Sequence, residues 1–100
     1  MKTVTICGSM RFADEMKRIA FELEIEHGFN VLQCVYDPKD VPLTEEMIQK
    51  LTEAYFAKID LSDAIYVVDI GGYIGEAVCG EIKYARKLGK EVLVHSTFCP

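Results

Sequence analysis

Hydrophobic and polar residues follow two different rhythms along this chain. Four short runs are rich in apolar and β-branched residues and are separated by glycine, proline or polar residues, which is the pattern of β-strands. They occupy residues 3–9, 29–36, 64–70 and 91–96. Between the runs, apolar residues recur at the spacing of one helix face. The clearest series are Phe12, Met16, Ile19, Ala20 and Leu23, and Met47, Leu51, Tyr55 and Ile59.

The ends of the predicted helices carry the residues expected there. Gly28 stops the first helix, and Thr44 can cap the second. The third helix follows the glycine-rich residues 71–75, and residues 97–100 form a short tail. Strands and helices therefore alternate along the whole chain.

The first, third and fourth strands are mostly apolar, as expected when helices cover both faces of a parallel sheet. Right-handed crossovers then give a three-layer, doubly wound α/β fold of about four strands. We expect a flavodoxin- or Rossmann-like sheet with the strand order 2-1-3-4. The 100 residues suffice for a single domain, spanning residues 1–100.

Composition and charge exclude several classes of function. A net charge of −5 argues against a protein that coats nucleic acid. No apolar run approaches the roughly 20 residues of a membrane helix, and the beginning of the sequence lacks the apolar core of a signal peptide. We therefore expect a cytoplasmic protein whose partner is a small molecule rather than nucleic acid or a membrane.

The cysteine pattern gives no sign of a metal site. The four cysteines form no CxxC pair, and neither histidine lies close to two of them. Cys7 and Cys34 are most simply small residues of the core. The turn after the first strand matches neither GxGxxG nor a P-loop, so we expect no metal and no cofactor.

Two glycine-containing loops mark the expected ligand site. In open α/β sheets, ligands bind beyond the carboxyl ends of the strands, where the winding direction reverses; for the order 2-1-3-4 this lies between strands one and three. The loops that meet there are Cys7–Arg11 and Asp69–Glu76. Their candidate binding residues are Gly8, Ser9, Met10, Arg11, Asp69, Gly75 and Glu76.

The segment GSMR in the first loop has chemistry suited to an anion. Gly8 lets the backbone approach a ligand, Ser9 supplies a hydroxyl, and the free N–H groups of a helix's first turn favour negative charge. Arg11 adds a forked cation that suits phosphate or carboxylate. The alternative interpretation is that Ser9 only caps the helix and that Arg11 is a solvated charge.

Two glutamates occupy different faces of the predicted third helix. On a wheel at about 100° per residue, Val78, Ile82 and Ala85 form the apolar centre, and Glu81 falls inside that arc. Glu76 lies on the far side, where an acid in the first turn favours the helix dipole. A carboxyl group on the inner face is costly unless it has partners or faces a cavity, and burial raises its pKa. Glu81 is thus a candidate for acid–base or nucleophilic chemistry, or else a structural carboxylate.

Three segments give the sequence a resemblance to a known enzyme family. They are CGSMR after the first strand, IDLSDAIYVVD leading into the third, and CGEIKYARKLGKEV near the end. Together they resemble the nucleoside 2-deoxyribosyltransferase superfamily, which includes the deoxynucleoside 5′-monophosphate N-glycosidases. The resemblance covers nearly the whole chain, and residues 71–90 are most similar to a small branch of that superfamily.

The resemblance implies cleavage of the N-glycosidic bond of a deoxynucleoside or deoxynucleotide, with water or a second base as acceptor. The family's nucleophile segment matches EIKYA here, which implies that Glu81 attacks the sugar. GSMR matches the family's phosphate and sugar loop, which implies binding roles for Gly8, Ser9 and Arg11. Gly75 lies about where the family has a second phosphate-contacting turn.

The sequence departs from the family where an assisting aspartate is expected, because that position holds Tyr55. Asp60 is the acid that we assign to the assisting role, with a solvated residue at a helix end as the alternative. The Gly-Thr pair that usually precedes the nucleophile is also absent, since Val78, Cys79 and Gly80 stand there.

Two main functions follow, and they differ in what Glu81 does. The first is an enzyme that acts on N-glycosidic bonds. The second is a non-catalytic module of the same fold that binds a nucleotide or phosphosugar, with Glu81 holding sugar hydroxyls. A structural role through aromatic contacts is the third alternative. We also expect a homodimer or higher homo-oligomer, because the chain is small and a neighbouring subunit often closes the pocket in this superfamily.

Overall fold

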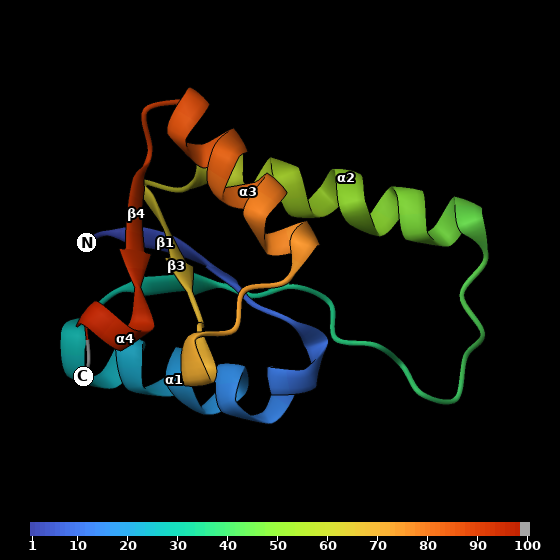
Figure 1. Ribbon diagram of the computed structural model, residues 1–100, viewed down its shortest axis with the longest axis horizontal. Coiled ribbons are helices and arrows are strands. Elements are labelled where there is room, and N and C mark those ends of the chain that lie inside the picture. Colours follow the sequence, from blue (N-terminus) through green and yellow to red (C-terminus); the bar gives the residue numbers. More distant parts are fainter. Residues whose placement is uncertain (99–100) are drawn as a thin grey trace.

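A sheet of four parallel strands forms the centre of the structure, a computed structural model that describes residues 1–98. The strands are Thr3–Cys7 (β1), Asn30–Leu32 (β2), Ala64–Val67 (β3) and Glu91–Val94 (β4). They lie in the order β2-β1-β3-β4 (Figure 1). This confirms the predicted α/β fold and strand order, and the winding direction reverses between β1 and β3.

Helices cover both faces of the sheet. The long helices in residues 1–98 are Ala13–His27 (α1), Glu45–Leu61 (α2) and Glu76–Lys87 (α3). The short ones are Met10–Phe12 (η1), Ile70–Gly72 (η2) and His95–Phe98 (α4). Figure 1 shows α1 and α4 on one face, and α2 and α3 on the other. The N-terminal half of α2 extends beyond the edge of the sheet (Figure 1).

Alternation along the central strands divides the core into two layers. Val4 and Ile6 of β1 and Tyr66 of β3 pack on the α1 side, whereas Cys7 and Ile65 pack on the side of α2 and α3. All five side chains are fully buried. Burying an aliphatic side chain of this size contributes about 1.5–3 kcal/mol. The same alternation fixes the thiol of the last residue of β1 on the α2 and α3 side.

The two helix boundaries predicted at Gly28 and Thr44 are confirmed. The hydroxyl of Thr44 accepts a hydrogen bond from the backbone N–H of Met47 at 3.1 Å. A cap of this kind contributes about 1 kcal/mol. Gly28 ends α1 with φ of 67°, a left-handed conformation that glycine adopts without a steric penalty.

The second strand is shorter than the sequence predicts. The apolar run extends over residues 29–36, but β2 ends at Leu32. β2 is an edge strand, so β1 is its only neighbour in the described sheet. Just beyond it, the ammonium group of Lys58 donates to the carbonyl oxygen of Gln33 at 2.9 Å. This contact ties the departing chain to α2 rather than to the sheet.

The fourth strand also ends early, and part of the predicted tail is helical. β4 ends at Val94, because the backbone N–H and the hydroxyl of Ser96 both donate to the carboxylate of Asp69, at 2.9 and 2.6 Å. The following turn is α4, in which Phe98 packs against the rings of His27 and Tyr66. Residues 99–100 of the predicted tail lie outside the described part of the chain.

Candidate functional site

A cavity of about 300 Å³ opens beside the carboxyl ends of β1 and β2. Its walls come from the loop after β1, the segment after β2, the inner face of α2, and one residue each of α1 and α3. The lining is Gly8, Met10, Met16, Cys34, Val35, Asp37, Pro38, Leu43, Ile48, Leu51, Thr52, Tyr55, Phe56, Lys58 and Glu81. A mostly apolar cavity with a few polar groups is the usual form of a small-molecule site.

Glu81 is the α3 residue that lines this cavity. It lies on the helix face that carries the buried Val78 and Ala85, and it is itself half-buried. Burial raises the pKa of Glu81 from 4.5 to about 7, and a hydrogen bond with the thiol of Cys7 opposes that rise. Near neutral pH, the side chain therefore exists in both its ionised and its protonated form.

A tyrosine and a thiol adjoin this carboxyl group. The hydroxyl oxygen of Tyr55 lies 2.7 Å from the carbonyl oxygen of Ile6 and 2.8 Å from the sulfur of Cys7. Burial raises the pKa of the Cys7 thiol and of the Tyr55 hydroxyl well above their ordinary values. Both groups therefore stay neutral over the pH range in which Glu81 titrates.

The sequence does not identify Cys7, Tyr55 or Asp37 as candidate residues of a functional site. The apolar pattern assigns Cys7 and Tyr55 to the core, and it does not single out Asp37 in the segment after β2. The sequence signal that could have identified Tyr55 is its position, because the resembled family has an aspartate there. Asp37 and Glu81 are the carboxylates that line the cavity among the described residues.

The loop after β1 contributes to the site mainly through Gly8 and Met10, which both line the cavity. A β-carbon on Gly8 would lie 2.9 Å from the sulfur of Met16 and 3.2 Å from Cβ of Val68, so the backbone approaches the core closely there. Ser9 caps η1, and its hydroxyl oxygen accepts a long hydrogen bond of 3.4 Å from the N–H of Arg11. The hydroxyl thus has the capping role that the alternative interpretation gave it.

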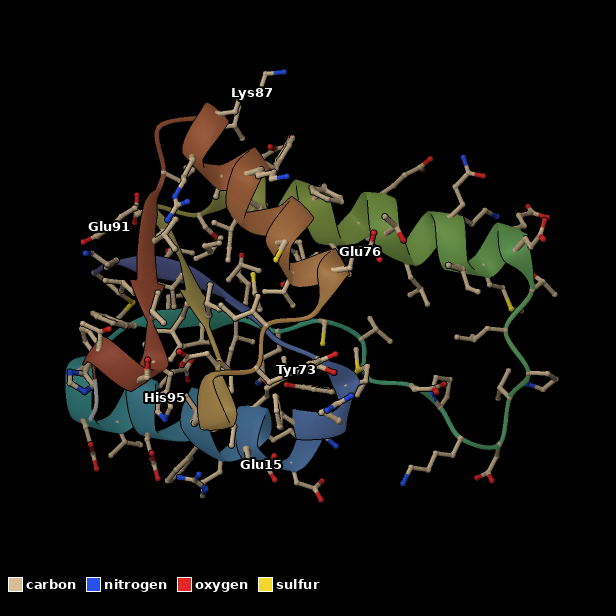
Figure 2. The ribbon with its side chains drawn as sticks, in the orientation of Figure 1. Glu15, Tyr73, Glu76, Lys87, Glu91 and His95 are labelled. Atoms are coloured by element: carbon tan, nitrogen blue, oxygen red, sulfur yellow. The ribbon has the colours of Figure 1, made fainter. Side chains whose placement is uncertain are left out.

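Arg11 and the N-terminus of α3 are linked through Tyr73. The guanidinium carbon of Arg11 lies 4.0 Å from the centre of the Tyr73 ring, a distance at which cation and ring attract. A β-carbon on Gly75, the residue that precedes α3, would lie 3.4 Å from the Tyr73 hydroxyl. Figure 2 shows Tyr73 in the segment leading into α3 and Glu76 on its first turn, where Glu76 is exposed.

The two predicted aspartates lie apart from Glu81. Asp69 is buried, and Ser96 donates to both of its carboxylate oxygens, so its charge holds α4 in place. Asp60 is exposed near the C-terminal end of α2, where it accepts a hydrogen bond of 2.6 Å from the hydroxyl of Tyr84. Neither aspartate lines the cavity.

Metal-ligand clusters and membrane-spanning helices are both absent from the described part of the chain. Residues 1–98 contain no group of three or more His, Cys, Asp or Glu side chains that could hold a metal ion. In the same residues, no helix has the length and apolar character needed to cross a membrane.

Comparison with known proteins does not place the chain in a family. No family model matches it, and neither a curated protein nor a solved structure matches it. The relationship suggested by the three sequence segments therefore stays a proposal, and the geometry of the cavity has to support any function assigned to it.

Proposed function

We propose that the protein cleaves or transfers the N-glycosidic bond of a nucleoside or nucleotide, with Glu81 as the nucleophile. The observation that carries this proposal is a half-buried glutamate that faces a mostly apolar cavity of about 300 Å³. A cavity of this size and lining suits a flat base, and a carboxylate at its wall can reach the sugar carbon to which the base is attached.

In the proposed reaction, a carboxylate oxygen of Glu81 attacks the anomeric carbon C1′ of the sugar. The bond between C1′ and the base nitrogen breaks, and its electron pair leaves with the base, which takes up a proton. Water or a second base then attacks C1′, releases the carboxylate and loses a proton. Asp37, the other carboxylate on the cavity wall, is better placed than Asp60 to exchange these protons.

A phosphate on the sugar would find its partners in the residues that follow Gly8 and Met10 of the cavity wall and at the beginning of α3. Arg11 provides a forked cation, and the N–H groups at the beginning of α3 follow Gly75, which has no side chain to cap them. Tyr73 contacts both elements and so keeps them near each other. We therefore expect nucleoside 5′-monophosphates to be better substrates than nucleosides.

The direct test is incubation with a panel of deoxynucleosides, ribonucleosides and their 5′-monophosphates, followed by chromatography of the free bases. We expect base release, and we expect Arg11→Ala to lower kcat/KM for the preferred 5′-monophosphate by roughly 10- to 100-fold while changing kcat/KM for the nucleoside little. Arg18→Ala is the matched control, because Arg18 is an exposed arginine of α1 that pairs with Glu22. An equal loss for nucleoside and nucleotide in Arg11→Ala would remove the phosphate assignment.

The raised pKa also favours a second candidate function, a non-catalytic module that binds a nucleotide or phosphosugar. A protonated Glu81 can donate a hydrogen bond to a sugar oxygen, which an ionised carboxylate cannot do. The same panel separates the two functions. Saturable binding without release of base by the unaltered protein would support the binding module and contradict the enzyme.

We further propose a homodimer in which the second copy covers the mouth of the cavity. Met47 and Ile48 are 43% and 49% exposed on the half of α2 that extends beyond the sheet (Figure 1). Val35 and Val41, in the segment between β2 and α2, are exposed as well. Apolar residues gathered around one cavity are typical of a surface that another subunit buries.

The dimer can be tested by sedimentation at micromolar concentration. We expect Met47→Glu to shift the protein from dimer to monomer, because the new charge would be buried against the second copy. Ile25→Glu is the control, since Ile25 is 70% exposed on α1, on the opposite face of the sheet. An unaltered protein that sediments as a monomer would rule this arrangement out.

A further inference from the structure

A lysine of α2 fastens the segment that leaves the edge strand β2. The ammonium nitrogen of Lys58 lies 2.9 Å from the carbonyl oxygen of Gln33, the first residue after β2. Residues 33–43 form neither a strand nor a helix. Among the described residues, this is the hydrogen bond that joins them to another element of the fold. The position of the segment beside α2 therefore depends on one side chain.

Lys58 makes this contact although two carboxyl groups line the same cavity. These are the carboxyl groups of Asp37 and Glu81, yet none of the ion pairs in residues 1–98 includes Lys58. The lysine is half-buried, so water competes less for its hydrogen bond than it would at an exposed site. A charged donor on a backbone carbonyl oxygen fixes the main chain rather than neutralising an acid.

The same segment is held from the α1 side of the sheet by Tyr36. The side chains of Cys34 and Tyr36 pack against the core on that side. The ammonium nitrogen of Lys17 in α1 lies 4.7 Å from the centre of the Tyr36 ring, a distance at which cation and ring attract. The Tyr36 hydroxyl also donates to the side-chain oxygen of Gln33 at 3.1 Å. The stretch from Gln33 to Tyr36 is thus braced at its beginning by α2 and at its end by α1.

Asp37 follows this braced stretch directly and lines the cavity. Pro38 comes next, and a proline restricts the residue before it to extended backbone conformations. The backbone of Asp37 therefore has little freedom of its own. Where its carboxylate lies at the cavity wall depends on where residues 33–36 lie, so a shift of the Gln33 main chain would move the carboxylate.

We propose that Lys58 is a positioning residue that acts through the Gln33 carbonyl oxygen. It holds Asp37 at the cavity wall, where that carboxylate can exchange protons with the leaving base and the acceptor. This inference deepens the proposed function and rests on it for the reaction that Asp37 serves. Lys58 does not touch the substrate in this scheme, and no bond to its nitrogen forms or breaks. Its effect on the reaction passes through Asp37.

The experiment compares Lys58→Met, Lys58→Arg, Asp37→Asn and the double variant Lys58→Met/Asp37→Asn by two readouts. The first is the set of nitrogen-15 NMR order parameters of the backbone at residues 33–37. The second is kcat and KM for base release from the preferred substrate. Lys50→Met is the matched control, because Lys50 is an exposed lysine of α2 that pairs with Glu46 and lies outside the cavity. Thermal unfolding shows which variants are folded.

We expect the order parameters of residues 33–37 to fall in Lys58→Met into the range of a flexible backbone, below about 0.6, and to keep their values in Lys50→Met. We expect kcat of Lys58→Met to fall on the order of 10-fold with little change in KM, because a displaced carboxylate exchanges protons less often. Lys58→Arg keeps a charged donor and should restore most of both properties. The double variant should have the kcat of Asp37→Asn, because the position of the segment no longer matters once the carboxylate is gone.

The two readouts separate this inference from the proposed reaction. If the unaltered protein releases no base, the proposed reaction fails, and the order parameters still decide whether Lys58 holds the segment. Unchanged order parameters in Lys58→Met would overturn the positioning role, as would a loss of kcat in the double variant equal to the product of the two single losses. A rise in KM with kcat unchanged would make Lys58 a substrate-binding residue and would overturn it as well. Should Lys58→Met fail to fold, Lys58→Gln, whose side chain is shorter and polar, takes its place in both readouts.

Discussion

Glu81→Gln is expected to lower kcat for base release by at least about 10³-fold, because an amide oxygen is too weak a nucleophile to displace the base. The substitution keeps the shape of the side chain, so substrate binding should change little. The measurement is single-turnover release of base from the preferred substrate of the panel, with excess protein over substrate.

The matched control for this variant is Glu26→Gln. Glu26 is an exposed glutamate of α1, on the opposite face of the sheet from the cavity. It should retain the activity of the unaltered protein. If Glu81→Gln kept more than about a tenth of the activity, Glu81 would not be the nucleophile, since a lost nucleophile costs far more than that.

The same substitution is expected to stabilise the fold at about pH 8 by roughly 1–2 kcal/mol, a figure reduced to allow for the part of the side chain that water screens. The unfolded chain releases the Glu81 proton near pH 4.5, whereas the folded protein holds it until about pH 7. The folded state therefore binds more protons in this window, and the free energy of unfolding falls as the pH rises through it.

This prediction is tested by the difference between Glu81→Gln and the unaltered protein in denaturant unfolding across the pH range. The difference should be smallest below pH 4.5, grow up to about pH 7 and then stay constant. Taking the difference removes the contributions of all other carboxyl groups. A difference that does not depend on pH would show that Glu81 is not withdrawn from water in the folded protein.

The fold and the place of Glu81 depend on short-range patterns, which is why the sequence predicts them. The apolar runs at β1 and β3 and the helical spacing on α1 identify their elements without reference to the rest of the chain. Glu81 follows from the wheel of a single helix, because one apolar stripe defines the inner face of α3. Predictions of this kind need only the angle between successive residues around a helix and the alternation of side chains along a strand.

The partners of Glu81 depend on contacts between distant segments, and these are not readable from periodicity. Tyr55 and Asp60 are five positions apart on α2, which separates them by roughly 140° around the helix. Tyr55 therefore faces the cavity while Asp60 faces Tyr84. β3 ends at Val67, so Asp69 lies two residues beyond the strand rather than at its predicted end. Ser96 of α4 donates to the carboxylate of Asp69, and that short helix has no signal in the apolar pattern.

The two sides of the cavity differ in how firmly the rest of the protein holds them. One side rests on β1 and α3, which the sheet supports. The opposite side includes the first half of α2 and the segment before it, whereas Ile59, the fully buried residue of that helix, lies near its C-terminal end. Segments with so little anchoring open at low energetic cost. A pliant wall can adjust to bases of different width, so selectivity among purines and pyrimidines should be weak even where the sugar and its phosphate are chosen strictly.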